Sequence, residues 1–334
     1  MSGRPAADGN GRDDRRRLTS TALSALALAL ALPAAVDSQE PPAAPYVRVL
    51  GTAQDGGIPQ IGGRFAPDEA ARRDPAKRRL VASLLVVDPA SGKRWLVDAT
   101  PDVRDQLERA ADDPPGRDPG DRPLLDGVFL THAHMGHYLG LAQFGREGLG
   151  ADHLPTYGSA RMVELLARNA PWELAVRLGH LEPRTLEPGR AIELTPGLTI
   201  TPILVPHRAE YTDTFGFVVR GPRRALLYIP DIDKWERWSE RVEDRIAKVD
   251  VALLDGTFFA DGELGAGRSM AEIPHPFIAE SLARFAALPA AERAKIVFTH
   301  LNHSNPAALD GTRERAAIEA AGMHVANESQ RIDL

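Results

Sequence analysis

The chain has 334 residues, of which 43% are hydrophobic and 26% charged, with no cysteine and ten histidines. This length fits one large domain or two small ones, and the hydrophobic fraction excludes a disordered chain. The lack of cysteine excludes disulfides, thiolate metal sites and cysteine nucleophiles, and a net charge of -6 argues against nucleic acid as a partner. Any metal site must therefore use imidazole and carboxylate ligands.

The N-terminal segment has the pattern of an export signal. The run Arg15-Arg-Arg17 precedes an apolar stretch of mostly Ala and Leu, Leu18–Leu32, and small residues follow. This order is typical of a secretory signal, and the arginine run resembles a twin-arginine signal. The stretch is shorter than the roughly 20 residues of a membrane span, although an uncleaved anchor is the alternative. We expect a signal peptide at 1–35, a linker at 36–45 and a folded domain at 46–334, in a periplasmic or secreted protein without a stable membrane anchor after cleavage.

The first half of the expected domain is rich in strand signals. Short apolar, β-branched runs end at Gly, Pro or Asp, and one segment of Ala, Leu and charged residues between them has helical spacing. A helix with Ser159 as its N-cap follows the histidine-rich segment described below. The sequence predicts strands at Tyr46–Gly51, Leu80–Asp88, Trp95–Asp98 and Gly127–Leu130, helices at Pro101–Ala111 and Ser159–Asn169, and a loop at Asp112–Asp121.

In the second half, strand-like runs alternate with helical stretches. The predicted strands are Leu198–Val205, Phe215–Arg220, Ala225–Ile229, Val251–Leu254 and Ile296–Thr299, and the predicted helices lie near 233–247, 274–287 and 306–321. Alternation of this kind, after strands joined by turns, favours a mixed α/β fold in which helices cover the sheets. Polar residues cluster directly after the strand ends, where functional residues commonly lie.

The densest group of candidate ligands is the segment Thr131-His-Ala-His-Met-Gly-His137. His132 and His134 follow a predicted strand and, two residues apart in an extended segment, point the same way, so that both can bind one cation. His137 follows the turn and faces a neighbouring position. Three histidines within six residues indicate a metal site rather than a structural role.

Four later strands also end in side chains that bind metals. His207 follows one strand, Asp231 and Asp233 follow the next, Asp255 ends another, and His300 and His303 follow the last. Metal sites that draw ligands from several strand ends in this way suit zinc, iron or manganese when the ligands are imidazole and carboxylate.

This ordered set resembles the metallo-β-lactamase superfamily, whose fold is an αββα sandwich of two mixed sheets flanked by helices. The resemblance extends over about residues 46–305. That family's first motif is H-x-H-x-D-H, followed by a lone His, a bridging Asp and a last His. By resemblance, the metal ligands are His132, His134, His137, His207, Asp231 and His300. Within the superfamily, Val49–Pro59, Leu254–Phe258 and His300–Pro306 resemble the pyrroloquinoline-quinone biosynthesis B proteins, and Trp95–Pro101 is similar to the carbon–phosphorus-lyase phosphodiesterase branch.

One position departs from the family motif. Gly136 stands where the superfamily has the Asp that binds a second metal and orients the attacking water. The first subsite, His132, His134, His207 and Asp231, is complete, whereas the second lacks one ligand. The residues that we consider as replacements are Asp233, Asp255, His275 and His303. Three protein ligands and a water also make a catalytic metal site.

The remaining polar candidates receive secondary roles. Asp98 is expected to accept a hydrogen bond from a ligating imidazole, and Asp255 to orient a ligand or cap a turn. Asp233 either shares the site or caps a helix, and His275 is a candidate substrate or metal group. Glu210, Tyr211 and Asp213 are expected in a solvated loop, with a place in the pocket wall as the alternative. His153, His180 and His324 are expected in structural or surface positions, and Gly51–Gly57 in a tight turn that borders the site.

The leading functional hypothesis is a metal-dependent hydrolase. Bound zinc, as one or two ions, with iron or manganese as alternatives, would give hydroxide near neutral pH for attack on an ester, lactone, amide or phosphodiester of a small-molecule substrate. Asp231, His137 and His275 are the catalytic candidates. The resemblance to the quinone-biosynthesis proteins implies a second hypothesis, an iron-dependent oxidoreductase. A non-catalytic binding protein on the same fold is the third.

Overall fold

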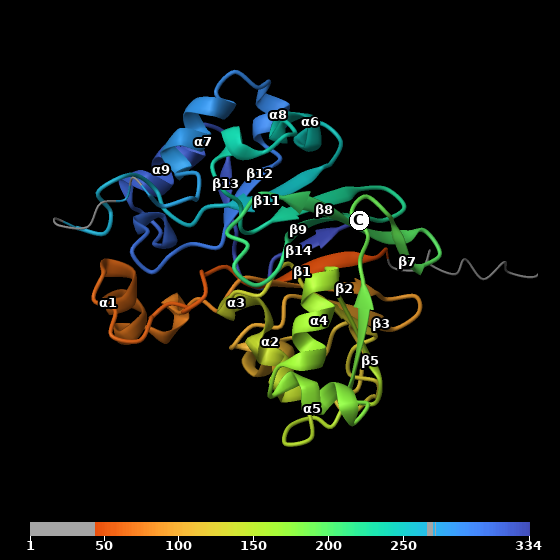
Figure 1. Cartoon of the computed structure of the whole chain (residues 1–334). Helices are drawn as coiled ribbons and strands as arrows, with labels where there is room; N and C mark the ends of the chain where they lie inside the picture. The colour runs from red at the N-terminus through yellow and green to blue at the C-terminus, as the bar shows by residue number, and fades with distance from the viewer. Residues whose placement is uncertain (1–43, 266–269, 271) are drawn as a thin grey trace, which may run out of the picture. The chain divides into compact units, whose positions relative to one another are not determined.

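Two mixed β-sheets form the centre of the computed structural model, which describes residues 44–265, 270 and 272–334 (Figure 1). Within these residues each sheet has seven strands. The predicted signal peptide, residues 1–35, and most of the predicted linker lie outside the described residues. None of the helices in the described part of the chain is both long and apolar enough to cross a membrane.

The first sheet has the order β14-β1-β2-β3-β4-β5-β6. Its strands are antiparallel from β14 to β3 and parallel from β3 to β6. Their bounds are β1 Tyr46–Gly51, β2 Ser83–Asp88, β3 Lys93–Val97, β4 Gly127–Phe129, β5 Leu154–Gly158, β6 Leu181–Thr185 and β14 Arg331–Asp333.

The second sheet has the order β13-β12-β11-β10-β9-β8-β7. Strands β10 to β13 are parallel and β7 to β10 antiparallel, so each sheet is mixed. Their bounds are β7 Ile192–Thr195, β8 Leu198–Val205, β9 Thr214–Arg220, β10 Ala225–Ile229, β11 Val251–Asp255, β12 Ile296–Thr299 and β13 His324–Val325.

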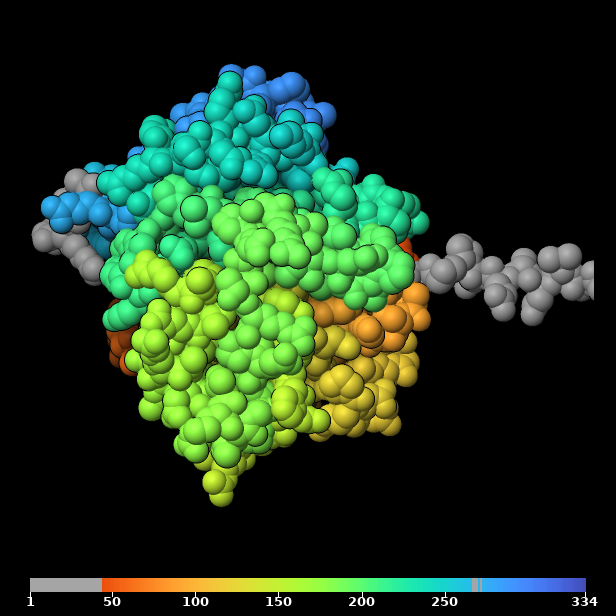
Figure 2. Space-filling view, turned by 45° about the vertical axis from the view of Figure 1, so that its right-hand side comes forward, coloured from red at the N-terminus to blue at the C-terminus, as the bar shows by residue number. Residues whose placement is uncertain are grey.

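Helices cover the outer face of each sheet, which confirms the predicted αββα sandwich (Figure 1). Helices α2, α4 and α5 pack on the first sheet, and α6, α7 and α9 on the second. Figure 2 shows one face on which the first-sheet half, orange to yellow-green, meets the second-sheet half, green to blue. The helices are α1 Ala66–Arg73, α2 Val103–Arg109, α3 Met135–Tyr138, α4 Ala160–Arg168, α5 Trp172–Arg177, α6 Val242–Ile246, α7 Ile278–Phe285, α8 Ala290–Arg293 and α9 Arg313–Ala320.

The alternation of side chains along each strand sorts the apolar residues into layers. On β4, Val128 packs under the helices of the first sheet, whereas Phe129 points between the sheets. On β11, Leu253 joins the layer between the sheets and Leu254 the layer under the helices. Because both faces of these strands are buried, their sequences are nearly continuous apolar runs, and this is the pattern that made them recognisable.

Phe129 lies at the centre of the layer between the sheets. Its ring stacks on Tyr157 of β5 with 4.4 Å between centroids, and its edge meets Phe217 of β9 at 6.0 Å. The next residues in the chain are those of the histidine segment. The packing of Phe129 therefore sets where that segment leaves the first sheet relative to the second.

The helix predicted at 233–247 is wrong as a single element. A short 3-10 turn at Trp235–Arg237 and helix α6 replace it. Trp238 between them has an extended backbone, and its indole donates to the Leu204 carbonyl on β8 at 3.1 Å. Both tryptophans are buried against the second sheet, so tertiary packing overrides the local helical spacing.

The other helices have clear physical boundaries. Ser159 caps α4 as predicted, since its side chain accepts from the Met162 amide. Helix α7 begins after Pro276, later than predicted, because the residue before a proline is disfavoured in helical conformation. The stretch 306–321 is divided: a 3-10 turn spans Pro306–Ala308, and Gly311, whose φ is 76°, precedes Thr312, which caps α9.

Substitution Phe129→Ala should reduce the free energy of unfolding by about 3–5 kcal/mol, because it leaves a cavity between the two sheets. Leu204→Ala, on an exposed position of β8 that is 51% accessible, should change it by about 0.5 kcal/mol or less. Urea denaturation of both variants measures the difference. Equal losses in the two variants would contradict the central role of Phe129.

Candidate metal centre

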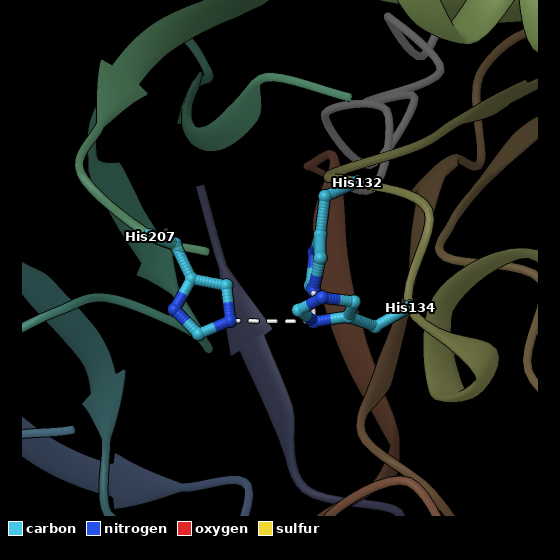
Figure 3. A group of neighbouring side chains, drawn as sticks. All are labelled: His132, His134 and His207. Atoms are coloured by element: carbon cyan, nitrogen blue, oxygen red, sulfur yellow. Dashed lines mark hydrogen bonds between the residues drawn. The ribbon is translucent and has the colours of Figure 1, made fainter. Parts of the chain in front are cut away.

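Three imidazoles converge where the two sheets meet at their ligand-bearing edge. His132 and His134 follow β4, and His207 follows β8 of the other sheet (Figure 3). His132 Nε2 lies 2.9 Å from His134 Nδ1, which lies 3.3 Å from His207 Nε2. The three nitrogens belong to one group that could hold a metal ion, as the sequence predicts for the first subsite.

The carboxylate of Asp231, just after β10, lies beside this group and is only 3% exposed. Its Oδ2 is 3.5 Å from His132 Nε2, and its Oδ1 is 3.9 Å from His207 Nε2. On the other side, Oδ2 is 2.9 Å from His137 Nε2 and 3.3 Å from His300 Nε2. Asp231 thus occupies the bridging position between two groups of imidazoles, and the structure brings all six predicted metal ligands together.

These distances fit ligands that share a metal ion. With metal–ligand bonds of about 2.1 Å and tetrahedral angles, ligand atoms lie about 3.4 Å apart. The Nε2 atoms of His137 and His300 are buried and have no hydrogen-bond partner among the described residues. Buried polar atoms without partners are rare, and a metal ion bound at this place would satisfy both. The residues present therefore fit a metal, and a metal cofactor is supported.

The electrostatics of the centre point the same way. Burial lowers the pKa of His132 well below its ordinary value and also lowers the pKa of His207 and His300. A lowered pKa favours the neutral form of an imidazole, which is the form that binds metals. Burial alone would raise the pKa of Asp231, but the surrounding histidines, His300 and His207 foremost, hold it well below its usual range. The site is a buried carboxylate among imidazole nitrogens, and such a charge needs a cation.

The comparisons with known proteins decide the family. The family model described as "Beta-lactamase superfamily domain" matches residues 93–331. The chain belongs to the beta-lactamase superfamily. Two proteins named coenzyme PQQ synthesis protein B are similar to it along almost their whole length. The one from Methylobacterium radiotolerans is 29% identical over 86% of this chain and 99% of that protein, and the one from Methylobacterium nodulans is 30% identical with the same coverage.

Solved structures agree on the fold of this superfamily member. Zn(2+)-bound PqqB from Methylobacterium extorquens superposes with a TM-score of 0.72, at 24% sequence identity over 86% of this chain and 100% of that one. A diphosphatase from the PhnP family superposes with a TM-score of 0.60, also at 24% identity, over 87% and 97% of the two chains. The resemblance that the sequence motifs indicated is thereby confirmed at the level of family and fold.

Asp98 is not one of the predicted metal ligands, but it orients the ligand His137. The His137 Nδ1 donates to Asp98 Oδ2 at 2.8 Å, and the amide of Thr131 donates to Oδ1 at 2.8 Å. Burial opposes a charge on His137, but Asp98 and Asp231 outweigh it and raise its pKa well above the ordinary value. Asp98 thus makes the contact that the sequence predicts for it.

Asp98 and His300 each have a strained backbone conformation. Their φ values are 67° and 60°, in the left-handed region that residues with side chains rarely adopt. Both directly follow a strand, β3 and β12 respectively, and both are completely buried. Such strain costs about 1–3 kcal/mol per residue and persists where the surroundings enforce it, typically at functional sites. Here it turns the two side chains from the strand ends into the centre.

Asp255 and His275 form a second oriented pair. His275 Nδ1 donates to Asp255 Oδ2 at 2.8 Å and lies 3.4 Å from Asp231 Oδ1. Burial would lower the pKa of His275, but the two carboxylates raise it to about 9. Asp255 also accepts from the amides of Ile232 and Thr257, so it is an orienting residue, and it belongs to none of the candidate metal groups in the described residues.

The other candidates lie around the centre or away from it. Asp233 Oδ1 lies 3.4 Å from His207 Nδ1, and it caps none of the described helices. His303 contacts Asp68 at 2.8 Å and belongs to none of the candidate metal groups of the described residues. Glu210 lies in an exposed loop, as predicted, and its Oε2 is 3.1 Å from His134 Nε2. As predicted, Tyr211 is exposed, Asp213 is partly exposed, His153 and His324 are at the surface, and His180 bonds to a loop carbonyl.

The sequence analysis missed Asp55. This residue belongs to the Gly51–Gly57 segment, which borders the site as predicted, but its carboxylate also enters the centre. Asp55 Oδ1 accepts a hydrogen bond from the Gly136 amide at 3.1 Å and lies 3.7 Å from His137 Nε2. An acidic residue in a glycine-rich loop after the first strand, at the edge where the other motifs gather, is a signal that could have revealed it.

A cavity of about 710 Å³ opens beside the centre. Its wall is formed mainly by the loops after β1 and β12, by residues near α3 and by the segment before α7. Lining residues include Asp55, Ile61, Met135, Arg208, Phe258, Leu264, His275 and His303. Among the described residues, the cavity wall therefore combines apolar side chains with the guanidinium of Arg208 and the carboxylates of Asp55 and Asp102.

Substitution Asp98→Asn should lower zinc affinity by roughly 10–100-fold, because it weakens the contact that orients His137. Asn is chosen since it tolerates the left-handed backbone at this position. Competition with a chromogenic chelator measures the affinity. Asp88→Asn removes another buried carboxylate of the first sheet, one that contacts only its own turn, and should leave the affinity unchanged. An unaltered affinity in Asp98→Asn would contradict the orienting role.

Proposed function

We propose that this protein is a metal-dependent hydrolase of small anionic substrates, with phosphodiesters as the first class to test and other esters, lactones and amides after them. The observation that carries the proposal is the position of Asp231, whose two oxygens face imidazoles from both sheets. A shared carboxylate of this kind is suited to hydrolytic metal centres, in which ligands and substrate gather at one open edge.

Zinc is the proposed cofactor, as one or two ions. The donors are imidazoles and carboxylates without thiolates, and the structurally similar PqqB is zinc-bound. When bound, zinc would supply a Lewis acid and make water a nucleophile near neutral pH. The chain holds the ligands in fixed orientations: Asp98 bonds to His137, and Thr257 lies 3.0 Å from the ring of His300.

Arg208 supports an anionic substrate. Its guanidinium lies 3.5 Å from His134 Nδ1 and lines the cavity, so it places a positive charge next to the reacting position. Guanidinium groups bind phosphate and carboxylate oxygens in two-pronged geometry. The apolar wall, with Met135 and Phe258, suits a less polar remainder of the substrate. The diphosphatase of similar fold also favours phosphorus esters as the first substrates to test.

His275 is the proposed proton donor to the leaving group. Its Nδ1 is bonded to Asp255, which leaves Nε2 as the nitrogen free to face a substrate in the cavity that the residue lines. Asp255 is fully buried and is itself held by two backbone amides. The ring is therefore fixed in position before substrate binds, as efficient proton transfer requires.

The second candidate is the iron-dependent oxidoreductase that the resemblance to the quinone-biosynthesis proteins implies, and the relatives named coenzyme PQQ synthesis protein B support a role in cofactor synthesis. Iron accepts the same imidazole and carboxylate ligands. Oxygen consumption by the iron-loaded protein in the presence of a tyrosine-containing substrate would favour this function over hydrolysis. Tight binding of a small molecule with neither turnover nor oxygen consumption would favour a binding protein.

The hydrolase proposal predicts a metal-dependent rate on a panel of chromogenic phosphodiesters, carboxylic esters and lactones. His132→Ala removes a buried ligand and should lower that rate by more than the roughly 10–100-fold typical for loss of an outer contact. His153→Ala, an exposed histidine paired with Asp152, is the matched control and should retain the rate. Zinc-loaded protein without activity on any member of the panel would count against hydrolysis.

Arg208→Met should raise KM about tenfold for anionic substrates and leave neutral esters nearly unchanged. The reason is the loss of one charge-assisted contact at a partly exposed position, which is worth about 1.4 kcal/mol. Arg208→Lys should be intermediate, because it keeps the charge but not the two-pronged geometry. Equal effects on charged and neutral substrates would show that Arg208 does not select charge.

A further inference from the structure

Gly136 leaves no room for the carboxylate that the superfamily motif has at its position. A Cβ atom built on Gly136 would lie 2.2 Å from Asp55 Oδ1 and 2.8 Å from Asp55 Cα. Non-bonded carbon atoms need about 3.5 Å or more. The space beside Gly136 is therefore filled by a residue that is 81 positions away in the sequence.

The side chain that fills this space carries the same functional group. Asp55, His137 and His300 offer one oxygen and two nitrogens that all lie within 4.8 Å of one another. The two histidines are completely buried, and their Nε2 atoms have no hydrogen-bond partner in the described residues. Two unsatisfied nitrogens therefore face the region that the Asp55 carboxylate enters, with Asp231 Oδ2 at 2.9 Å and 3.3 Å from them.

The loop that carries Asp55 is tied to the loop that carries His300. The Gln54 amide donates to the Leu301 carbonyl at 2.8 Å, and the Leu301 amide donates to the Thr52 carbonyl at 2.8 Å. The Asn302 side chain also bonds to the Gln54 side chain. These bonds fix the backbone on either side of the two candidate ligands. The arrangement is preorganised, as metal sites with defined geometry require.

We propose that Asp55 replaces the missing motif aspartate and completes a second metal subsite with His137, His300 and the shared Asp231. The donor set of two imidazole nitrogens and two carboxylate oxygens suits zinc. This inference rests on the metal centre of the proposed function and adds the number of ions and the source of the last ligand. The first subsite, with His132, His134 and His207, does not depend on it.

A purely structural role for Asp55 makes a different prediction. Its Oδ1 accepts from the Gly136 amide, so the residue could serve only to hold α3 against the β1 loop. An asparagine at this position keeps an acceptor oxygen for that amide but loses the negative charge. A structural role therefore predicts no change of metal content in Asp55→Asn, whereas the ligand role predicts loss of the second ion.

The test is the zinc stoichiometry of the full chain. Wild-type protein and Asp55→Asn are saturated with zinc sulfate, freed of loosely bound ion by gel filtration and measured by inductively coupled plasma mass spectrometry. We expect about two ions per chain in the wild type and about one in Asp55→Asn. Calorimetric titration of the metal-free proteins should show that the weaker of two binding events is lost.

Asp102→Asn is the matched control. Asp102 also lies in a loop at the same cavity, and its carboxylate also accepts a backbone amide, that of Val81 at 2.9 Å. This variant should keep about two ions. Circular dichroism and thermal unfolding of all three proteins establish that the variants are folded.

The outcomes separate this inference from the proposed function. Two ions in Asp55→Asn, or a single ion in the wild type, would overturn the role of Asp55, whereas the hydrolase proposal, which allows one or two ions, would stand. A wild-type protein that binds no zinc, iron or manganese would overturn both.

Discussion

The carboxylate of Asp231 is the group on which the rest of the site depends. It is almost completely buried and lies within 3.9 Å of nitrogens from His132, His137, His207 and His300. A carboxylate buried without compensating charge would cost several kcal/mol, so the fold must bring positive charge or a cation to this point. The imidazoles of both sheets surround this point as ligands that could hold such a cation, and the site exists only because the sheets are packed in one relative position.

That relative position is maintained by apolar contacts directly behind the ligands. Phe129 packs against aromatic rings of both sheets and lies just before the histidine segment in the chain. Towards the site, the apolar layer gives way to buried polar residues that are held by hydrogen bonds, notably Asp98 to Thr131 and Asp255 to Thr257. The backbone strain at Asp98 and His300 lies at this boundary. The apolar core therefore supplies the energy that keeps strained ligand-bearing residues in place.

Much of this fold could be predicted from the sequence, because its information is local. Strands buried on both faces, such as β10 and β11, are continuous apolar runs, and the ligands follow their ends at short range. Features that depend on distant contacts could not be predicted. The two-residue strand β13 and the terminal strand β14 have no periodicity of their own, and Trp238 leaves a helical pattern to reach Leu204.

The same distinction applies to the site. Six ligands were recognised because each stands at a motif position or directly after a strand. Asp55 was not, because its carboxylate reaches the centre through a loop packed against Gly136, and its place in a glycine-rich loop is a weaker signal than a motif position. Glu210 lies in a solvated loop as expected, but its contact with His134 follows from no spacing along the chain. A contact between two loops depends on the tertiary structure, whereas a ligand that follows a strand can be recognised from the local sequence.

The close approach of Asp55 to Gly136 has a consequence for how this protein can change. An aspartate at position 136 would force the backbone at Asp55 to shift, because the Cα atom of Asp55 stands 2.8 Å from where its Cβ would lie. Loss of Asp55 alone removes a carboxylate without making enough room for another. The common motif could be accommodated here only if the β1 loop moved as well, so the residue at position 136 and the position of that loop can change only together.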